Sequence, residues 1–180
     1  MIAALKGKIY EKEAGKILLD VRDMIYELNV SLMTFSNAKE EGVFYISEII
    51  KENEYSLYGF ADKNEKKLFD SLIKLNGVGP KVALAICSTY TPATFMDIIS
   101  TQNINALKKI PGIGPKSAKR ILLEMGGFEI NIESQNPTHS QALSALENLG
   151  FKKEDILKVL NGIEGNVEEV IKEALKKLSK

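Results

Sequence analysis

The strongest constraint on the fold of this chain is a 15-residue segment that occurs twice. The first copy, at residues 72–86, has the sequence LIKLNGVGPKVALAI, and the second, at residues 107–121, has the sequence LKKIPGIGPKSAKRI. Eight of the fifteen positions are identical, and the two copies are offset by 35 residues. Because a repeated segment forms a repeated supersecondary unit, the chain is expected to contain two copies of one small structure.

Each copy has the sequence signals of two helices joined by a tight turn. A helical pattern ends at an apolar residue, a Gly-x-Gly turn follows, and Pro80 or Pro115 opens a second helix. The glycines permit positive φ angles and leave room for another backbone to approach. The start of the second helix presents unpaired N–H groups and the positive end of a dipole, which together bind phosphate. Val78 and Ile113, between the glycines, are expected to fill the space between the two helices.

This pattern resembles the helix-hairpin-helix family, in which the hairpin amides hold a nucleic-acid backbone without reading the bases. An ordinary tight turn between helices is the alternative, and it is less expected for two copies in tandem. A P-loop is excluded, because residues 114–117, Gly-Pro-Lys-Ser, lack the G-x-x-x-x-G-K-S/T spacing. The resemblance implies that the DNA-contacting residues are Gly77, Val78, Gly79, Lys81, Gly112, Ile113, Gly114, Lys116, Lys119 and Arg120.

The distribution of charge supports this interpretation, although the whole chain is neutral. Lys and Arg together number 24, and so do Asp and Glu. Residues 1–62 carry 7 basic and 11 acidic side chains, residues 63–128 carry 10 and 4, and residues 129–180 carry 7 and 9. The positive charge is thus confined to the segment that contains both hairpins, as expected for a phosphate-binding surface.

The composition argues against several other classes of protein. The single cysteine, Cys87, lies in an apolar run and is expected to be a buried core thiol in a reducing compartment. With one histidine, His139, and no zinc-type spacing, we expect neither a metal site nor a cofactor. The sequence shows no signal peptide and no apolar run of about 18 residues, so a cytoplasmic protein without membrane contact is expected.

The first 62 residues predict a small β-barrel. Short runs rich in Ile, Val, Leu and Tyr predict five strands, with a short helix between the third and the fourth. The strands are expected at residues 2–10, 16–21, 25–30, 43–50 and 55–60, and the helix within 32–41. Five strands with a helix at that position suit an OB-type barrel. Glu52 and Glu54 flank Asn53 in the turn between the last two strands, for which a plain solvated turn is the simplest interpretation.

The rest of the chain predicts two groups of helices, which gives an α+β multidomain protein. Residues 63–128 predict five helices that carry both hairpins, and Asp62 with Glu65 resembles a capping box. Residues 129–138 are polar and aperiodic, and they predict a flexible linker. Residues 139–180 predict a three-helix domain that is similar to ubiquitin-associated domains. A bundle this small and acidic favours docking of a partner over catalysis.

The order of these parts resembles the RuvA family along nearly the whole chain. A barrel that ends in LYGF at residues 57–60 precedes tandem hairpins with NGVGPK at residues 76–81 and IPGIG at residues 110–114. A linker and a three-helix tail complete the match. The resemblance implies structure-specific, sequence-independent binding of an open four-way (Holliday) junction during recombination and DNA repair.

The family resemblance also implies partners and their contact residues. It implies a homotetramer, or an octamer on DNA, that recruits the hexameric RuvB ATPase for branch migration, with the RuvC resolvase as a further member of the complex. ATP hydrolysis would then reside in RuvB. An acidic pin near the crossover matches Glu52, Asn53 and Glu54; the family's usual Glu-Asp pair falls on Glu52-Asn53, so Glu54 is the candidate for the missing charge. The positions that match the RuvB-docking surface are Leu146, Leu149, Phe151 and Leu175.

Two other functions fit parts of the sequence. Helix-hairpin-helix base-excision glycosylases and lyases carry a catalytic aspartate some twenty residues after the hairpin, but no aspartate occurs between Asp97 and Asp155. No catalytic residue is therefore expected, since an activity has to be argued from a site. A ubiquitin-type adaptor would rest on the tail alone. Cleavage of damaged duplex would favour the glycosylase, whereas a discrete complex with a four-way junction would favour the RuvA family.

Overall fold

The computed structural model describes residues 1–126, 137–160, 163 and 165–178. These residues belong to two compact units, Met1–Ile132 and Glu133–Lys180. Residues 129–136 of the predicted linker lie outside the described residues. The last two residues of the predicted linker, 137 and 138, belong to helix α7 (Pro137–Asn148). The first helix of the second unit therefore begins two residues before the predicted domain boundary.

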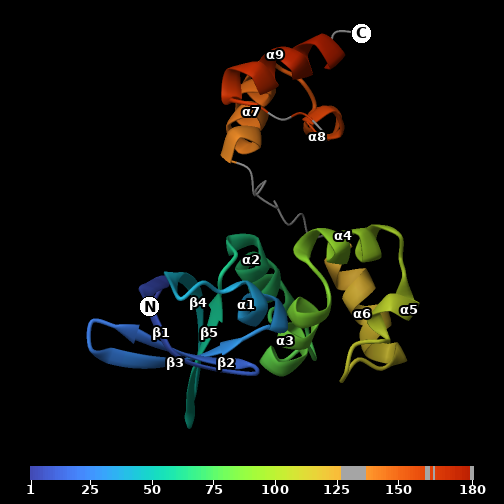
Figure 1. Ribbon diagram of the computed structural model, residues 1–180. Coiled ribbons are helices and arrows are strands. Elements are labelled where there is room, and N and C mark those ends of the chain that lie inside the picture. Colours follow the sequence, from blue (N-terminus) through green and yellow to red (C-terminus); the bar gives the residue numbers. More distant parts are fainter. Residues whose placement is uncertain (127–136, 161–162, 164, 179–180) are drawn as a thin grey trace. The chain divides into compact units, whose positions relative to one another are not determined.

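The N-terminal part of the first unit is a closed five-stranded barrel (Figure 1). Its strands are β1 (Ala4–Glu13), β2 (Lys16–Val21), β3 (Met24–Val30), β4 (Glu41–Lys51) and β5 (Glu54–Phe60). They pair in the order β1-β2-β3-β5-β4, antiparallel except for the parallel β3–β5 pair. The five predicted strands are confirmed, with ends that differ by at most three residues, and so is the helix between β3 and β4, α1 (Leu32–Asn37). Inward-facing apolar side chains fill the barrel, among them Ile17, Leu19, Leu28, Phe44 and Ile46.

Five helices follow the barrel and carry the repeat, as the sequence predicts. They are α2 (Lys63–Leu72), α3 (Pro80–Thr89), α4 (Pro92–Ser100), α5 (Ile104–Leu107) and α6 (Pro115–Met125). Their apolar sides form one buried cluster that also takes in Tyr58 and Phe60 of β5. Phe69 of α2 packs against both rings, with its centroid 4.9 Å from that of Tyr58 and 5.0 Å from that of Phe60. Cys87 lies in this cluster, as predicted, and burial raises the pKa of its thiol well above the usual value.

A buried polar network joins the barrel to the helices. The Glu65 carboxylate accepts hydrogen bonds from the hydroxyls of Ser31 and Thr34, at the start of α1. Thr34 Oγ1 in turn accepts from the Ala61 N–H at 3.1 Å, just after β5. The predicted capping box is therefore half right: Asp62 accepts from the Glu65 N–H at 2.8 Å, but the Glu65 side chain turns to the barrel. Burial raises the pKa of the Glu65 carboxyl, and the two hydroxyl donors oppose part of that rise.

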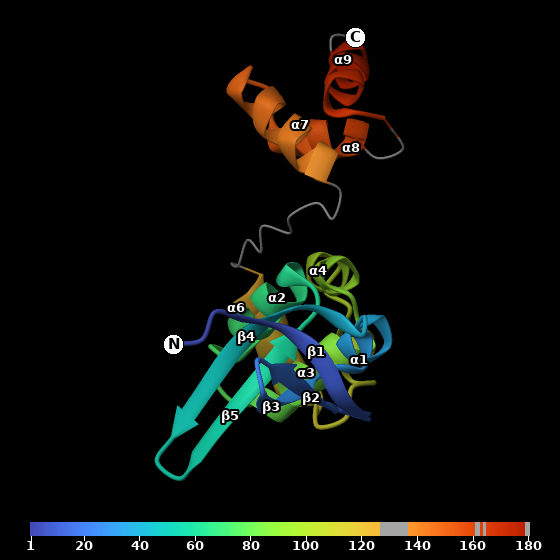
Figure 2. The same ribbon diagram turned by 60° about the vertical axis from the view of Figure 1, so that its left-hand side comes forward.

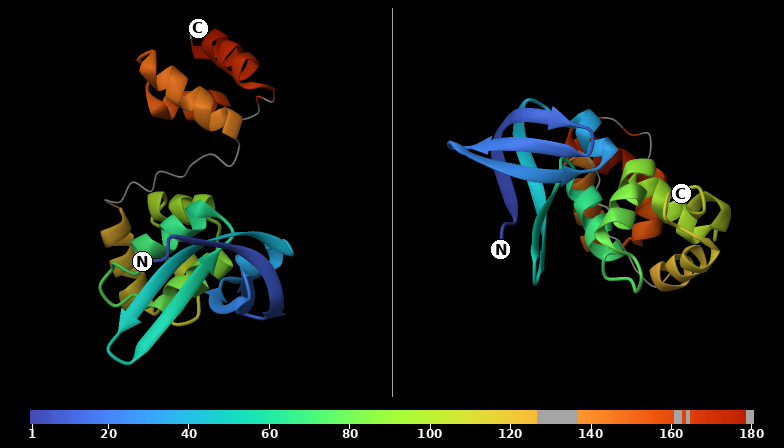
Figure 3. Two further views of the ribbon diagram at one scale, coloured as in Figure 1. Left: turned by 90° about the vertical axis from the view of Figure 1, so that its left-hand side faces the viewer. Right: turned by 90° about the horizontal axis from the view of Figure 1, so that it is seen from below.

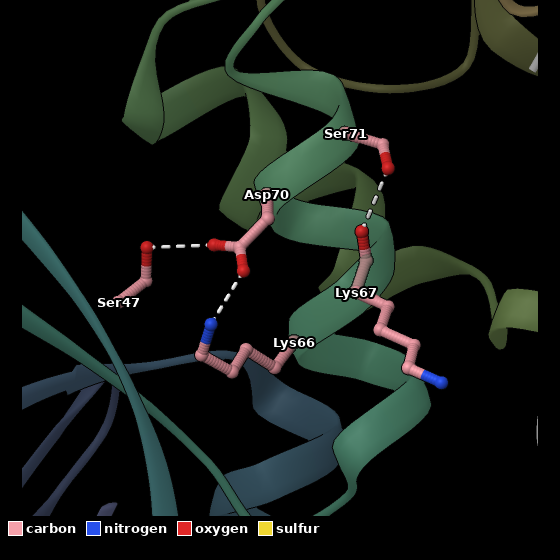
Figure 4. A network of polar contacts seen from close by, with 5 residues as sticks. All are labelled: Ser47, Lys66, Lys67, Asp70 and Ser71. Carbon is pink, nitrogen blue, oxygen red and sulfur yellow. Dashed lines mark hydrogen bonds and ion pairs between the residues drawn. The ribbon is translucent and has the colours of Figure 1, made fainter. Parts of the chain in front are cut away.

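A second polar contact ties β4 to α2, as Figure 4 shows. Ser47 Oγ donates to Asp70 Oδ1 at 2.7 Å, and the ammonium of Lys66, one turn earlier on α2, pairs with the other Asp70 oxygen. A third contact joins α1 to α3, where the Leu32 N–H donates to Ser88 Oγ at 3.0 Å. These contacts and the shared apolar cluster make the barrel and the hairpin-bearing helices one body. The β4–β5 turn and the two hairpins are therefore held in a fixed relation.

The second unit is a three-helix bundle made of α7, α8 (Lys153–Leu160) and α9 (Val167–Leu178), as predicted. Its core is formed by Ala142, Leu146, Ile156, Leu160, Ile163, Val170 and Ala174. At the start of α9, Asn166 and Glu169 each accept a hydrogen bond from the other's N–H, at 3.0 and 3.1 Å, which is a reciprocal capping box.

No single helix within the described ranges has the length and apolar character to cross a membrane. Among the helices of those ranges, the pair α3–α4, which is bent by 98°, meets the criteria jointly.

Candidate nucleic-acid interface

The two hairpins have nearly the same backbone geometry. Gly77 and Gly112 have φ angles of 78° and 86°, in the left-handed region that favours glycine. In the first turn the Val78 N–H donates to the Leu75 carbonyl at 3.1 Å, and the equivalent bond in the second turn also measures 3.1 Å. The repeated sequence therefore folds twice into the same turn, as predicted.

The residue between the two glycines anchors each turn from inside. Val78 is 7% exposed and Ile113 is 6% exposed, and both belong to the apolar cluster of the helices. The prediction that they fill the space between the helices is confirmed. Because these side chains are buried, a contact of the two residues with DNA would have to be made by their backbone, and that contact stays a prediction.

The second glycine of each hairpin has no conformational reason to be glycine. Gly79 and Gly114 have φ angles of −85° and −86°, which any residue adopts. A Cβ at either position would meet nothing within 4 Å in the described parts of the chain. Both are the N-caps of helices, α3 and α6, that begin with proline, and no described side chain caps them. The missing side chain leaves the first-turn amides open from outside, as a phosphate ligand would require.

Exposed lysines stand beside both of these helix starts. Lys81 and Lys116 are the second residues of α3 and α6, and both are exposed. Lys119, one turn further along α6, is exposed as well. A cation beside a helix N-terminus adds to the attraction for a phosphate oxygen. Their location agrees with the predicted contact role, which stays a prediction.

Arg120 makes a contact that the sequence did not predict. Its Nη1 donates to the Asn76 carbonyl of the other hairpin at 3.0 Å. The Asn76 N–H donates to Glu124 Oε2, one turn further along α6, at 3.4 Å. Neither Asn76 nor Glu124 was predicted as a site residue. Because these contacts span 44 and 48 positions in the chain, no local pattern reveals them.

The predicted acidic pin is the tip of a long β4–β5 hairpin that extends beyond the other strands (Figures 2 and 3). Lys51 pairs with Glu54 in the strand register, so Glu52 and Asn53 alone form the turn. Lys51 Nζ lies 2.9 Å from Glu54 Oε2. The tip thus has one lysine and two glutamates, and its net charge is −1 instead of the −2 that its acids alone would give.

Glu54, the candidate for the missing charge of the predicted pin, is paired with other groups. Besides the ion pair with Lys51, its other carboxylate oxygen accepts from Ser56 Oγ at 3.0 Å. The hydrogen bond from Lys51 is the main cause that lowers the pKa of Glu54, and the field of Lys81 contributes to the same shift.

The structure corrects one of the four predicted partner-docking residues. Leu146 is 0% exposed in the core of the bundle, so its side chain is structural. Leu149, just after α7, is 62% exposed. Phe151 and Leu175 are half-buried and pack against the bundle core. The accessible apolar surface at the predicted place is therefore centred on Leu149.

The barrel and the two repeated hairpins define the chain as a tandem helix-hairpin-helix protein built on an OB-type barrel. Within the described residues, no group of three or more His, Cys, Asp or Glu side chains could hold a metal ion. Three family descriptions match: the SAM-like helix-hairpin-helix tandem at residues 69–126, the RuvA N terminal domain at 1–59 and the RuvA C-terminal domain at 137–179. The chain belongs to the RuvA family.

Full-length relatives agree with this assignment. A protein of Nautilia profundicola is 76% identical over 100% of this chain and 98% of its own length. Proteins of Wolinella succinogenes and Sulfurimonas denitrificans are 49% and 45% identical, each over 99% of this chain and 98% of the relative. All three are named Holliday junction branch migration complex subunit RuvA. The similarity over the whole length favours the RuvA family over the glycosylase and adaptor alternatives.

Proposed function

We propose that this chain is the non-catalytic subunit of a branch migration complex and binds four-way junction DNA irrespective of sequence. The observation that carries the proposal is the pair Gly79 and Gly114, whose missing side chains open two equivalent helix starts to a ligand from outside. Backbone amides and lysine ammonium groups bind phosphate but carry no base-specific information. Specificity for a junction must then come from the arrangement of the sites in space.

Several copies of the chain would supply that arrangement. A homotetramer, or an octamer on DNA, would present the same pair of hairpins to each arm of a junction, so that weak contacts add through multivalency. The predicted pin would then stand close to the crossover. Carboxylates there would repel a duplex that crosses the centre, whereas the strands of a junction diverge from it.

The test is a binding competition at one fixed salt concentration. The full-length chain is titrated into a labelled four-way junction, with linear duplex of the same sequence as competitor, and the titration is repeated with a junction of unrelated sequence. We expect discrete complexes and the same affinity for both junctions, with much weaker binding to duplex. Equal affinity for junction and duplex, or a strong dependence on sequence, would contradict the proposal.

We further propose that the C-terminal bundle docks the motor of the complex, the RuvB ATPase, in the cytoplasm. The exposed Leu149 and the half-buried Phe151 supply an apolar contact next to the end of α7. The variant Leu149→Asp is expected to abolish stimulation of the partner's ATPase on junction DNA and to leave junction binding intact. Leu146→Asp is the matched control: it places a charge in the core and should lose the helical circular dichroism of the bundle. Full stimulation by Leu149→Asp would overturn this part.

A further inference from the structure

The residue that leads into the first hairpin is held by the second copy of the repeat. The Asn76 carbonyl accepts from Arg120 Nη1 at 3.0 Å, and the Asn76 N–H donates to Glu124 Oε2 at 3.4 Å. Arg120 and Glu124 are four residues apart on α6 and therefore lie on the same side of that helix. Both polar groups of one backbone residue are thus held by one helix face.

Among the residues that the structure describes, this arrangement has no counterpart at the second hairpin. The 35-residue offset places Pro111 opposite Asn76, and proline has no N–H to donate. It places Ala85 opposite Arg120 and Thr89 opposite Glu124, so neither the guanidinium nor the carboxylate is repeated. The second hairpin instead borders an apolar group of α3, because a Cβ at Gly112 would lie 3.4 Å from Val82 Cγ2.

Glu124 is an unexpected neighbour for a phosphate site. A carboxylate close to the first hairpin repels the DNA backbone, so its charge alone would weaken binding. The contact with Asn76 gives the carboxylate a different role. Arg120 bonds the Asn76 carbonyl, and Glu124 bonds the Asn76 N–H. Asn76 lies directly before Gly77, the positive-φ glycine of the turn.

We infer that Arg120 and Glu124 are positioning residues that fix the first hairpin relative to the second. The inference rests on the proposed function, because it concerns how the two phosphate sites engage DNA together. Two sites at a fixed separation bind as one bivalent unit, whereas a loose site loses that advantage. Arg120 therefore acts through Asn76 and sets the spacing between the hairpins. The sequence alone had suggested that Arg120 is a direct phosphate ligand.

Two substitutions of Glu124 separate a positioning role from simple charge repulsion, because the two roles predict opposite changes in junction affinity for Glu124→Ala. Glu124→Ala removes both the charge and the acceptor, whereas Glu124→Gln removes the charge and keeps an acceptor for Asn76. We expect Glu124→Ala to weaken junction binding by about three- to tenfold and Glu124→Gln to retain wild-type affinity or exceed it. Glu11→Ala, at an exposed position on β1, is the control for loss of one negative charge. Tighter or unchanged binding by Glu124→Ala would overturn the inference.

A measurement without DNA tests the same inference independently of the proposed function. Amide hydrogen exchange is followed in the free full-length chain, in peptides that cover residues 75–79 and residues 110–114. Glu124→Ala and Arg120→Ala are expected to speed exchange in the first hairpin and leave the second unchanged. If the variants change the exchange rate of both hairpins equally, or of neither, the positioning role is refuted even when junction binding is intact. If the variants show the expected exchange pattern but the wild-type chain does not prefer a junction to a duplex, only the proposed function is refuted.

Discussion

The two hairpins share one local structure but are held in different ways. Their first glycines have φ angles of 78° and 86°, and their second glycines have φ angles of −85° and −86°. The first hairpin is tied to α6 by polar contacts, whereas the second borders an apolar side chain of α3. The comparison shows that the repeated sequence determines the turn, while the parts that are not repeated determine how each turn is positioned.

The largest effect is expected from filling the open space at the two helix starts. Gly79→Asn and Gly114→Asn each add a favourable N-cap side chain that would bond the same amides a phosphate needs. A hydrogen bond to a charged group is worth about 1.5–3 kcal/mol, so each variant should weaken junction binding by roughly 10- to 100-fold, and the pair by more. The melting temperature should stay the same or rise, because both positions have ordinary backbone and free space.

The control for these variants is Gly42→Asn, in the barrel, where a Cβ would also meet nothing within 4 Å in the described parts of the chain. It should leave binding unchanged. If only one of the two hairpin variants weakens binding, the copies do not contribute equally; if neither does, the phosphate sites lie elsewhere.

The next largest effect concerns the stability of the turns. Gly77→Ala and Gly112→Ala put a side chain into the left-handed region, which costs about 1–2 kcal/mol of unfolding free energy. Gly77→Ala should cost more, because its Cβ would lie 2.9 Å from Arg120 Nη1 and would displace that group from Asn76, whereas Gly112→Ala meets only Val82 at 3.4 Å. Urea denaturation of both variants checks this order, with Gly79→Ala as the control without strain. A larger loss at Gly112 would contradict the described difference between the copies.

A smaller effect is expected from the lysines that follow the hairpins. Lys81→Ala and Lys116→Ala should each weaken binding to junctions of any sequence, and each should reduce the slope of log affinity against log salt by about one. The double variant should reduce the slope by about two. Titrations at several salt concentrations measure this. A slope that only one lysine changes would show that a single hairpin carries the DNA contact.

The smallest effect is expected at the pin, because its net charge is only −1. Replacement of Glu52 and Glu54 by Gln should strengthen duplex binding by a few-fold more than junction binding, since repulsion at the centre acts mainly on a continuous duplex. Glu54→Gln also frees Lys51 from its ion pair, so it should account for more of the change than Glu52→Gln. The measurement is the junction-to-duplex affinity ratio at fixed salt. An unchanged ratio in the double variant would make this tip an ordinary solvated turn.

The sequence was sufficient where the structure depends on local signals. The strands, the turn glycines and the two buried residues between them follow from alternation, helix periodicity and the needs of a tight turn. It was insufficient where contacts join distant parts of the chain. Glu65 has the spacing of a capping box but bonds to the barrel, and Leu146 and Leu149 look alike until the packing of the bundle buries one of them. The hydrogen bonds of Asn76 likewise depend on Arg120 and Glu124, on the helix of the other copy.

The proposed function requires that DNA phosphates bind at the two opened helix starts. Its most direct test is amide hydrogen exchange of the full-length chain with and without a saturating four-way junction. We predict protection in peptides that cover residues 77–83 and 112–118, and no change in β2 and β3 of the barrel. Protection confined to the barrel strands, with both hairpins exchanging as in the free chain, would show that DNA does not bind at the helix starts.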